Sequence, residues 1–369
     1  MTGKLAILAP LKEWGGIERK LLILCQEFIA RGIDVEFILT RGGQVPYPDE
    51  FPEQVRVVDL GSRHKLDAVP RLVRHLRGSR PDALLTAKDH AAKVAVIARR
   101  LSRVDLRLVV KVTNTLSQTL RRPGKRHTAR WLYPGADGIL AISHGVKADL
   151  IDRFGIDSQL IHVIYNPMVT TNMDQRAACI TGHPWLDRDD IPVVLGAGRL
   201  TQQKDFATLL RAFASLHRDR SSRLVILGEG PERSQLERLA QELGIANHVL
   251  MPGYQRDPLP WMARATVFAL SSRYEGLGNV LVEAMAVGTP VVSTDCPSGP
   301  REILEDGRYG TLVEAGAPPA LARALSEAID NPLSSDLLKA GAKRFESGVI
   351  AEQYISMLGL GGEGRATSR

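Results

Sequence analysis

The chain has 369 residues, of which 44% are apolar and 24% are charged. This composition is typical of a globular protein and the length suits two or three domains, which excludes a disordered chain and a disulfide-stapled miniprotein. No apolar run approaches the roughly 20 residues of a membrane-spanning helix, and we expect no secretory signal in the short apolar start. The three cysteines, Cys25, Cys179 and Cys296, lack metal-ligand spacing and fit a reducing cytoplasm.

Charge is unevenly distributed along the chain. Residues 1–168 carry 27 Lys and Arg against 17 Asp and Glu, a net charge of +10, whereas the remainder carries 21 against 24, a net charge of −3. Most of the excess lies in residues 61–130, with 18 basic and 4 acidic side chains. Such asymmetry predicts an anionic partner for the first half only: nucleic acid, a phospholipid surface or a phosphorylated substrate.

In the first half, short β-branched apolar runs alternate with helical patterns. They predict strands at 4–9, 34–39, 55–60, 82–86, 107–112, 138–142 and 161–165. Helices are predicted at 17–31, 67–77, 90–102, 125–133 and 145–153. This alternation indicates an α/β domain whose parallel sheet is covered on both faces.

The same alternation pauses over residues 166–191, which we interpret as an interdomain linker, and then restarts. Strands are predicted at 192–198, 223–228, 248–251, 266–270, 290–293 and 311–313. Helices are predicted at 205–217, 231–243, 258–264, 279–287, 318–330 and 349–358. We therefore expect two domains, 1–168 and 169–345, with the segment 346–369 packing back on the first.

Basic side chains follow the strand at 192–198. The segment GAGRLTQQKD (196–205) ends this strand in a Gly-rich turn and places Arg199 and Lys204 just before a helix, with Asp205 as its expected cap. An Arg fork and a Lys point charge beside a helix start suit a diphosphate. The alternative is a solvated basic loop.

The segment SSRYEGLGNVLVEAMAVGTPVVS (271–293) is the most informative about function. Glu275 lies in the loop and Glu283 lies about one turn into an apolar helix. A carboxylate among Val, Leu, Ala and Met needs a partner or a ligand. The intervening turn, Leu277-Gly278-Asn279, allows close backbone approach and offers helix-start N–H groups to an anion. One carboxylate then suits a ribose and the other a sugar, while the alternative is a glutamate bonded to the backbone.

Two neighbouring loops have simpler interpretations. ILGEGPE (226–232) predicts a plain strand-to-helix turn with Pro231 at the helix start. DCPSGPREIL (295–304) predicts a rigid loop in which Arg301 and Glu302 cap or pair locally. Neither loop identifies a ligand.

Two segments of the first domain are also candidates for binding. LKEWGGIERK (11–20) places Gly15 and Gly16 where a phosphate or sugar can approach closely, unless they form only a permissive turn. LRRPGKRHTARWLYPG (120–135) mixes five Lys and Arg with Trp131 and Tyr133. That mixture suits an anionic bilayer surface, and the alternative is a solvated helix face. No nucleic-acid-binding signature, metal cluster or nucleophile elbow is present.

Together these segments resemble the family 4 retaining glycosyltransferases of the GT-B fold, over nearly the whole chain. GRLTQQKD resembles the diphosphate-binding turn of that family, EGLGNVLVE its pair of glutamates separated by seven residues, and GGIERK its diglycine loop. AISHGVKADL (141–150) and VIYNP (163–167) resemble the run into its linker. The resemblance implies two Rossmann-like, doubly wound parallel-sheet domains facing an interdomain cleft.

The resemblance also implies roles for particular residues. The nucleotide-sugar donor is expected mainly on the second domain, with Glu275 as the catalytic residue beside the transferred sugar. The donor-binding residues implied are Arg199, Lys204, Glu283, Gly278, Asn279, Leu277, Tyr254 and Gly16. No metal or other cofactor is needed, because the two cations and the helix start stabilise the leaving diphosphate. One departure is that VVKVTNTLSQ (109–118) has Thr113 and Asn114 where many relatives carry a histidine.

We therefore expect a glycosyltransferase that moves a hexose or N-acetylhexosamine from a nucleotide sugar, first of all a UDP-sugar. Its acceptor is expected to be lipid-linked or a cell-surface polysaccharide. We expect it in the cytoplasm, peripheral on the inner face of the cell membrane through its basic first domain, with no nucleic-acid partner. The alternatives are a GT-B nucleotide-sugar epimerase or hydrolase and a non-catalytic GT-B binding protein.

Overall fold

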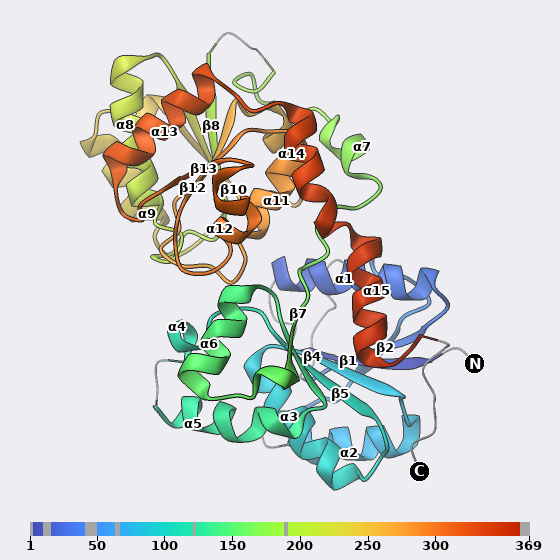
Figure 1. Cartoon of the computed structure of the whole chain (residues 1–369). Coiled ribbons are helices and arrows are strands. Elements are labelled where there is room, and N and C mark those ends of the chain that lie inside the picture. The colour runs from blue at the N-terminus through green and yellow to red at the C-terminus, as the bar shows by residue number, and fades with distance from the viewer. Residues whose placement is uncertain are drawn as a thin grey trace. The chain divides into compact units, whose positions relative to one another are not determined.

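A computed structural model describes residues 3–9, 16–40, 50–62, 67–120, 123–187 and 191–361. The chain divides into two compact units, coloured along the chain in Figure 1: unit 1 is Met1–Pro167 with Ser347–Arg369, and unit 2 is Met168–Glu346. Each unit is built on a wholly parallel sheet, which confirms the expected fold class of two doubly wound α/β domains. Three residues of the candidate binding segments fall outside this description: Gly15, Arg121 and Arg122. The backbone of Lys125 is described, but its side chain is not.

The sheet of unit 1 has the strand order β3-β2-β1-β4-β5-β6-β7 in the described part of the chain. Its strands are β1 (Lys4–Ala9), β2 (Asp34–Leu39), β3 (Arg56–Asp59), β4 (Ala83–Ala87), β5 (Arg107–Val112), β6 (Gly138–Ala141) and β7 (Ile161–Val163). The central strands β1 and β4 are buried almost throughout, because helices cover both faces of a parallel sheet. The order reverses between β1 and β4, which makes their carboxyl ends the topological switch point of unit 1.

The helices of unit 1 connect these strands and cover the sheet. They are α1 (Gly16–Ala30), α2 (Ala68–Ser79), α3 (Asp89–Ser102), α4 (Leu116–Thr119), α5 (Pro123–Leu132), α6 (His144–Phe154) and α15 (Ser347–Leu358), with 3₁₀ turns η2 (Tyr133–Gly135) and η3 (Ser158–Leu160). The ends of α6 follow from its sequence. The Ser143 hydroxyl accepts from the Val146 N–H at 3.1 Å, and Gly155 ends the helix in the left-handed conformation.

The last helix, α15, packs on unit 1 although it follows unit 2 in sequence. The ring of its Tyr354 is fully buried 6.3 Å from that of Phe28 on α1. Arg31 on α1 forms an ion pair with Glu352 at 2.6 Å. An apolar contact and a charged contact thus both join α15 to α1.

The sheet of unit 2 has the order β10-β9-β8-β11-β12-β13, so its switch point lies between β8 and β11. Its strands are β8 (Val193–Ala197), β9 (Arg223–Leu227), β10 (Val249–Gly253), β11 (Val267–Leu270), β12 (Val291–Thr294) and β13 (Thr311–Val313). Its helices are α7 (Met173–Ala177), α8 (Phe206–Asp219), α9 (Arg233–Glu242), α10 (Leu259–Arg264), α11 (Asn279–Ala286), α12 (Pro300–Ile303), α13 (Pro318–Asp330) and α14 (Ser335–Ala342), with 3₁₀ turns η4 (Ala246–His248), η5 (Glu305–Gly307) and η6 (Lys343–Phe345).

The interpretation of residues 166–191 as a linker is wrong for most of its length. Residues from Met168 onward belong to unit 2 and include α7, which packs against α10. Arg176 on α7 makes a two-pronged pair with Asp257, both distances being 2.8 Å. The polar composition of this stretch therefore reflects ion pairing on the surface of unit 2 and not a free connection. The sequence analysis also missed α14, which packs against α11.

None of the described helices is both long enough and apolar enough to cross a bilayer.

Candidate active site

Three loops meet at the carboxyl ends of β8, β11 and β12. They are residues 198–205 after β8, 271–278 after β11 and 295–299 after β12. In open α/β sheets ligands bind outside the carboxyl ends of the strands at the switch point. The two most informative sequence segments of the second domain, GAGRLTQQKD and SSRYEGLGN, occupy the first two of these loops.

Lys204 and Glu275 form an ion pair across this switch point. The Lys204 Nζ lies 2.6 Å from Oε1 of Glu275, and the Ser272 hydroxyl donates to the same oxygen at 2.6 Å. Glu275 is 6% exposed and Ser272 is fully buried. A buried carboxylate is stable when it is paired and hydrogen-bonded, as here. The pairing also places an ammonium group and a carboxylate side by side at the carboxyl ends of β8 and β11.

Hydrogen bonds lock the first loop to the second. The Ser271 hydroxyl donates to the Lys204 carbonyl at 2.8 Å, and the Gln203 side-chain amide donates to the Tyr274 carbonyl at 3.0 Å. Asp205, buried in a left-handed conformation at the start of α8, accepts from Arg273 Nε at 3.0 Å. Its side chain does not cap the helix N–H groups as expected; the Thr208 hydroxyl donates to it instead, at 2.9 Å.

The third loop is held by hydrogen bonds from hydroxyl groups, one of them buried. The Thr294 hydroxyl donates to the Ser272 carbonyl at 2.6 Å, and the Ser298 hydroxyl donates to the Gly276 carbonyl at 3.0 Å. Gly299 has φ +97, and a Cβ there would lie 2.0 Å from the Leu277 carbonyl oxygen. Only glycine therefore allows this loop to approach the Glu275 loop so closely.

The start of α11 lies beside the ion pair in sequence and structure. Gly278 precedes the helix with φ +95, a left-handed conformation that glycine adopts without strain. Asn279 begins α11 half-buried, and Glu283 lies half-buried one turn further on. Leu277 is 1% exposed, so its side chain belongs to the core and only its backbone can border a ligand.

The turn that carries Arg199 depends on the loop after β9. Gly198 N–H donates to the Leu227 carbonyl and Leu200 N–H to the Glu229 carbonyl, both at 2.9 Å. A Cβ on Gly228 would lie 1.9 Å from the Gly198 carbonyl oxygen. The segment ILGEGPE is therefore more than the plain turn we expected, because its glycines let it pack against the Arg199 turn. The Arg199 side chain is exposed.

The remaining residues singled out in the sequence are more scattered. Tyr254, just after β10, is 47% exposed. Gly16 begins α1 of unit 1, and among the described residues outside its own helix and chain neighbours no heavy atom lies within 4 Å of a Cβ built on it. Asn114, which with Thr113 occupies the stretch where we expected a histidine, is half-buried after β5 and accepts from the Thr115 N–H at 2.9 Å. Arg301 pairs with Asp295 and Asp306, which is the local pairing expected for it.

Sequence reasoning missed three buried supports of this site: Ser272, Thr294 and Cys296. Burial, together with the neighbouring charge of Glu275, raises the pKa of the Cys296 thiol to about 12. The only signal in the sequence was their place directly after predicted strands. Within the described residues, no group of three His, Cys, Asp or Glu side chains is placed to hold a metal ion. The site can thus offer cations, helix-start N–H groups and two carboxylates to a ligand.

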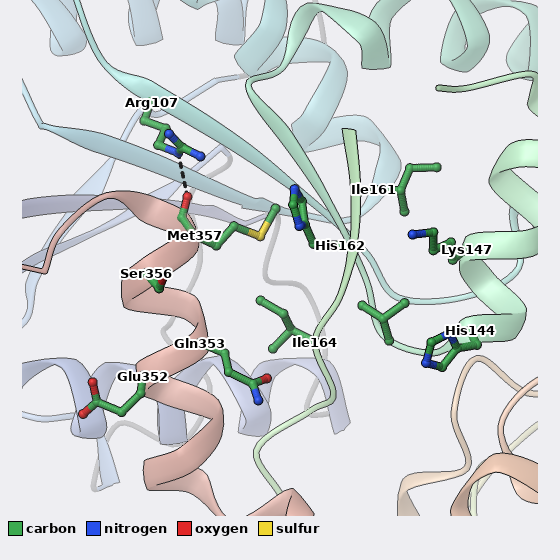
Figure 2. A pocket seen from close by; sticks show the side chains of 11 residues that line it. Arg107, His144, Lys147, Ile161, His162, Ile164, Glu352, Gln353, Ser356 and Met357 are labelled. Carbon is green, nitrogen blue, oxygen red and sulfur yellow. Dashed lines mark hydrogen bonds between the residues drawn. The ribbon is translucent and has the colours of Figure 1, made fainter. Parts of the chain in front are cut away.

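Unit 1 has a pocket of about 860 Å³ beside the edge strand β7. Figure 2 shows Arg107 and His144 at opposite ends of it, with His162 between them, so these three side chains do not converge on one point. Arg107 Nε donates to the Met357 carbonyl of α15 at 2.6 Å, the dashed line in Figure 2. None of its lining residues follows β1 or β4, the strands of the unit 1 switch point, and we assign the pocket no part in the site.

The wholly parallel, doubly wound sheets and the cationic turn beside a helix start are the architecture of the GT-B glycosyltransferases. Two family models match the chain: one described as Glycosyltransferase Family 4 over residues 14–171 and one described as Glycosyl transferases group 1 over residues 184–345. Each half of the chain thus matches a glycosyltransferase family model, and both units have the doubly wound sheet of the GT-B fold.

Named relatives align with parts of the chain. The N-acetylgalactosamine-N,N'-diacetylbacillosaminyl-diphospho-undecaprenol 4-alpha-N-acetylgalactosaminyltransferase of Campylobacter jejuni is 34% identical over 235 residues, 62% of this chain and 61% of that protein. The lipopolysaccharide core biosynthesis glycosyltransferase LpsE of Rhizobium meliloti is 38% identical over 174 residues, 46% of this chain and 50% of that protein. The chain therefore aligns with only about half to three-fifths of the length of these relatives.

Solved structures share the fold over nearly the whole chain. Anabaena HepE, determined in complex with UDP, superposes with a TM-score of 0.82 at 23% identity, covering 96% of this chain and 99% of that one. The outer core galactosyltransferase WaaB superposes with a TM-score of 0.74 at 24% identity. At this level of identity the likeness establishes the fold alone.

Proposed function

We propose that this protein is a retaining glycosyltransferase that moves a hexose or N-acetylhexosamine from a UDP-sugar to a lipid-linked or polysaccharide acceptor. The observation that carries the proposal is the Lys204–Glu275 pair, held by three interlocked loops beside the start of α11. The names of the relatives, which are lipopolysaccharide and lipid-linked glycan transferases, support the acceptor class. The UDP in HepE supports the choice of nucleotide.

The donor diphosphate is proposed to bind Arg199, Lys204 and the first N–H groups of α11. Arg199 is exposed, and a guanidinium group can donate to two phosphate oxygens at once. The N–H groups of Gly278 and Asn279 carry the positive end of the helix dipole. Glu283 takes the ribose hydroxyls, and Tyr254 borders the base.

The chemical step needs negative charge to be stabilised on the departing diphosphate. Lys204, held by Glu275, and the α11 start are in place before the donor arrives, so they supply this stabilisation without reorganisation, and Arg199 adds its charge. In the proposed complex the Lys204 ammonium bridges Glu275 and the diphosphate, and Glu275 contacts the transferred sugar. A metal ion is not required in this scheme, because the cations and the helix start do its electrostatic work.

A thermal-shift panel tests the proposal. UDP, GDP, ADP and their common sugar conjugates are added to the full chain in EDTA and again with magnesium. We expect the melting temperature to rise with UDP and UDP-sugars to the same extent in both conditions, and slow UDP release from one UDP-sugar. No shift with any nucleotide would contradict the donor site, and a shift that requires magnesium would contradict the metal-free scheme.

We also propose that the face formed by α3 and α5 of unit 1 contacts an anionic membrane surface. Trp131 on α5 is 73% exposed, and Leu101 and Ile97 on the adjoining α3 are 55% and 38% exposed. Arg126 and Arg130 lie on the same helix as Trp131. An exposed Trp among cations suits the headgroup region of a bilayer.

Vesicle co-sedimentation tests this surface. Trp131→Ser should reduce binding to vesicles with 30% phosphatidylglycerol, whereas Val349→Ser, which removes an apolar side chain 47% exposed on α15, should not. Equal binding by wild type and Trp131→Ser would contradict the proposal.

A further inference from the structure

The switch point of unit 1 carries an ion pair that the proposed function has not used. Lys88 directly follows β4, and its Nζ lies 2.6 Å from Oε1 of Glu18 in the first turn of α1. Glu18 is nearly buried, with a side chain 5% exposed, whereas the Lys88 side chain is 33% exposed. The buried carboxylate thus holds an ammonium group that still reaches the surface.

The backbone of Lys88 is unusual for a residue with a side chain. Its φ and ψ are 76° and 141°, a region that glycine adopts readily and lysine does not. Arg80 and Arg103 also have positive φ, but each ends a helix in the ordinary left-handed conformation. No such helix-end role applies to Lys88, because it precedes α3. Strained residues at strand ends gather at functional sites.

The same arrangement occurs at the switch point of unit 2. In unit 2 the lysine, Lys204, follows β8 and the glutamate, Glu275, follows β11. In unit 1 the order is reversed: the glutamate, Glu18, comes after β1 and the lysine, Lys88, comes after β4. Both pairs have Nζ to Oε1 distances of 2.6 Å, and in both the glutamate is buried. Unit 2 also has non-glycine residues with positive φ in its site loops, Asp205 and Ser298.

Among the described residues, the acid next to Lys88 in the sequence has partners of its own. Asp89, the next residue, pairs with Lys93 at 3.0 Å and accepts from the Tyr133 hydroxyl at 3.1 Å. Glu18 is therefore the carboxylate that neutralises Lys88. The pair offers an N–H donor and a carboxylate acceptor side by side. That pattern matches sugar hydroxyls, which both donate and accept.

We infer that Lys88 contacts the hydroxyl groups of an acceptor sugar on unit 1 and that Glu18 is the positioning residue that holds its ammonium group. This inference rests on the proposed function, since it assigns the acceptor side of that reaction. Its geometry lies wholly within unit 1, at the ends of β1 and β4.

Saturation-transfer NMR on the full chain with saturating UDP tests the inference. The probes are the methyl glycosides of glucose, galactose and N-acetylglucosamine. For at least one of them we expect Lys88→Met to lower the transfer at least about fivefold and Glu18→Gln to lower it less. Lys88→Arg should keep at least about half, because it restores the charged donor.

Lys4→Met is the matched control. Lys4 begins β1 and pairs with a buried glutamate, Glu36 on β2, so it lies at the amino ends of the strands and not at the carboxyl ends, where Lys88 lies. Its side chain is 25% exposed. Its loss should leave sugar binding unchanged. UDP affinity, measured separately, should stay within about twofold of wild type in every variant.

Three results would overturn the inference: equal transfer in wild type and Lys88→Met, an equal loss in Lys4→Met, or no transfer from any of the three glycosides to wild type. Failure of the proposed function has a different signature, because the wild-type chain would then neither bind UDP nor release it from a UDP-sugar.

Discussion

Lys204 and Glu275 are 71 residues apart in the sequence, yet the Lys204 ammonium and the Glu275 carboxylate are 2.6 Å apart in unit 2. The pair joins the loops after the two central strands of the sheet. Because Ser272 donates to the same carboxylate oxygen, the acid is fixed from two sides. Removal of either charged partner should therefore affect the stability of unit 2 as well as ligand binding.

A double-mutant cycle measures this coupling. Lys204→Met leaves a buried carboxylate without its cation, so we expect it to lower the free energy of unfolding by about 2–4 kcal/mol. Glu275→Gln should cost less, because glutamine is neutral. The double variant should be more stable than the sum of the two effects predicts by at least about 1 kcal/mol. Urea unfolding at pH 7.5 gives all four values, and additivity within about 0.5 kcal/mol would contradict the coupling.

Glycine substitutions test the close approach of the loops. Gly299→Ala places a Cβ 2.0 Å from the Leu277 carbonyl oxygen. Gly316→Ala also has a positive φ, +74, but its Cβ has no heavy atom within 4 Å among the described residues beyond its chain neighbours. Both variants strain the backbone, but only the first forces two loops apart. We expect Gly299→Ala to lose about 2 kcal/mol more stability than Gly316→Ala and to weaken UDP binding. Equal losses of stability in the two variants would show that the loops can move apart without a free-energy cost.

The fold could be predicted from the sequence because buried parallel strands are short apolar runs, and each run can be recognised from its own residues. The strand ends could be located in the same way, which is why Arg199, Lys204 and Glu275 were singled out. The buried residues that support this site could not be predicted, because the hydrogen bonds of Ser272 and Thr294 depend on which strands are neighbours in the sheet. Strand order is a property of the whole sheet.

The polar stretch before β8 was predicted wrongly as a linker, because its composition is misleading. Its prolines and acids have the composition of a linker, and the pairing of Arg176 with Asp257 joins residues 81 positions apart. Local composition cannot distinguish a solvated connection from a surface segment fixed by distant ion pairs. The same limit hid the Glu18–Lys88 pair, whose members lie 70 residues apart.

Thiol alkylation distinguishes the three cysteines. Cys179 is exposed, whereas burial raises the pKa of both Cys25 and Cys296 to about 12. At pH 8 only Cys179 should react with iodoacetamide in the folded chain, since the thiolate is the reactive form. Peptide mass mapping reads the outcome, and a Cys179→Ser variant should remain unmodified. Rapid labelling of Cys296 would mean that the loop after β12 opens in solution.

Lys111 should make stability depend on pH in a defined direction. It is buried on β5, with its ammonium 5.3 Å from the ring centre of Tyr354, and burial together with the charge of Lys20 lowers its pKa to about 7. In the unfolded chain its pKa is near the ordinary value of 10.5. Between these two values the unfolded state binds more protons, so the free energy of unfolding should rise with pH, by up to about 1.4 kcal/mol per unit.

Lys111→Met tests this effect. Methionine fills a similar volume without a charge, so at pH 6 the variant should be more stable than wild type by about 3 kcal/mol, after the smaller loss of the contact with Tyr354. The difference should shrink as the pH rises from 7 to 10, because wild-type Lys111 loses its proton in the folded state. Urea unfolding of both proteins at pH 6, 7, 8 and 9 measures it. A variant less stable than wild type at pH 6 would mean that a charged Lys111 stabilises unit 1.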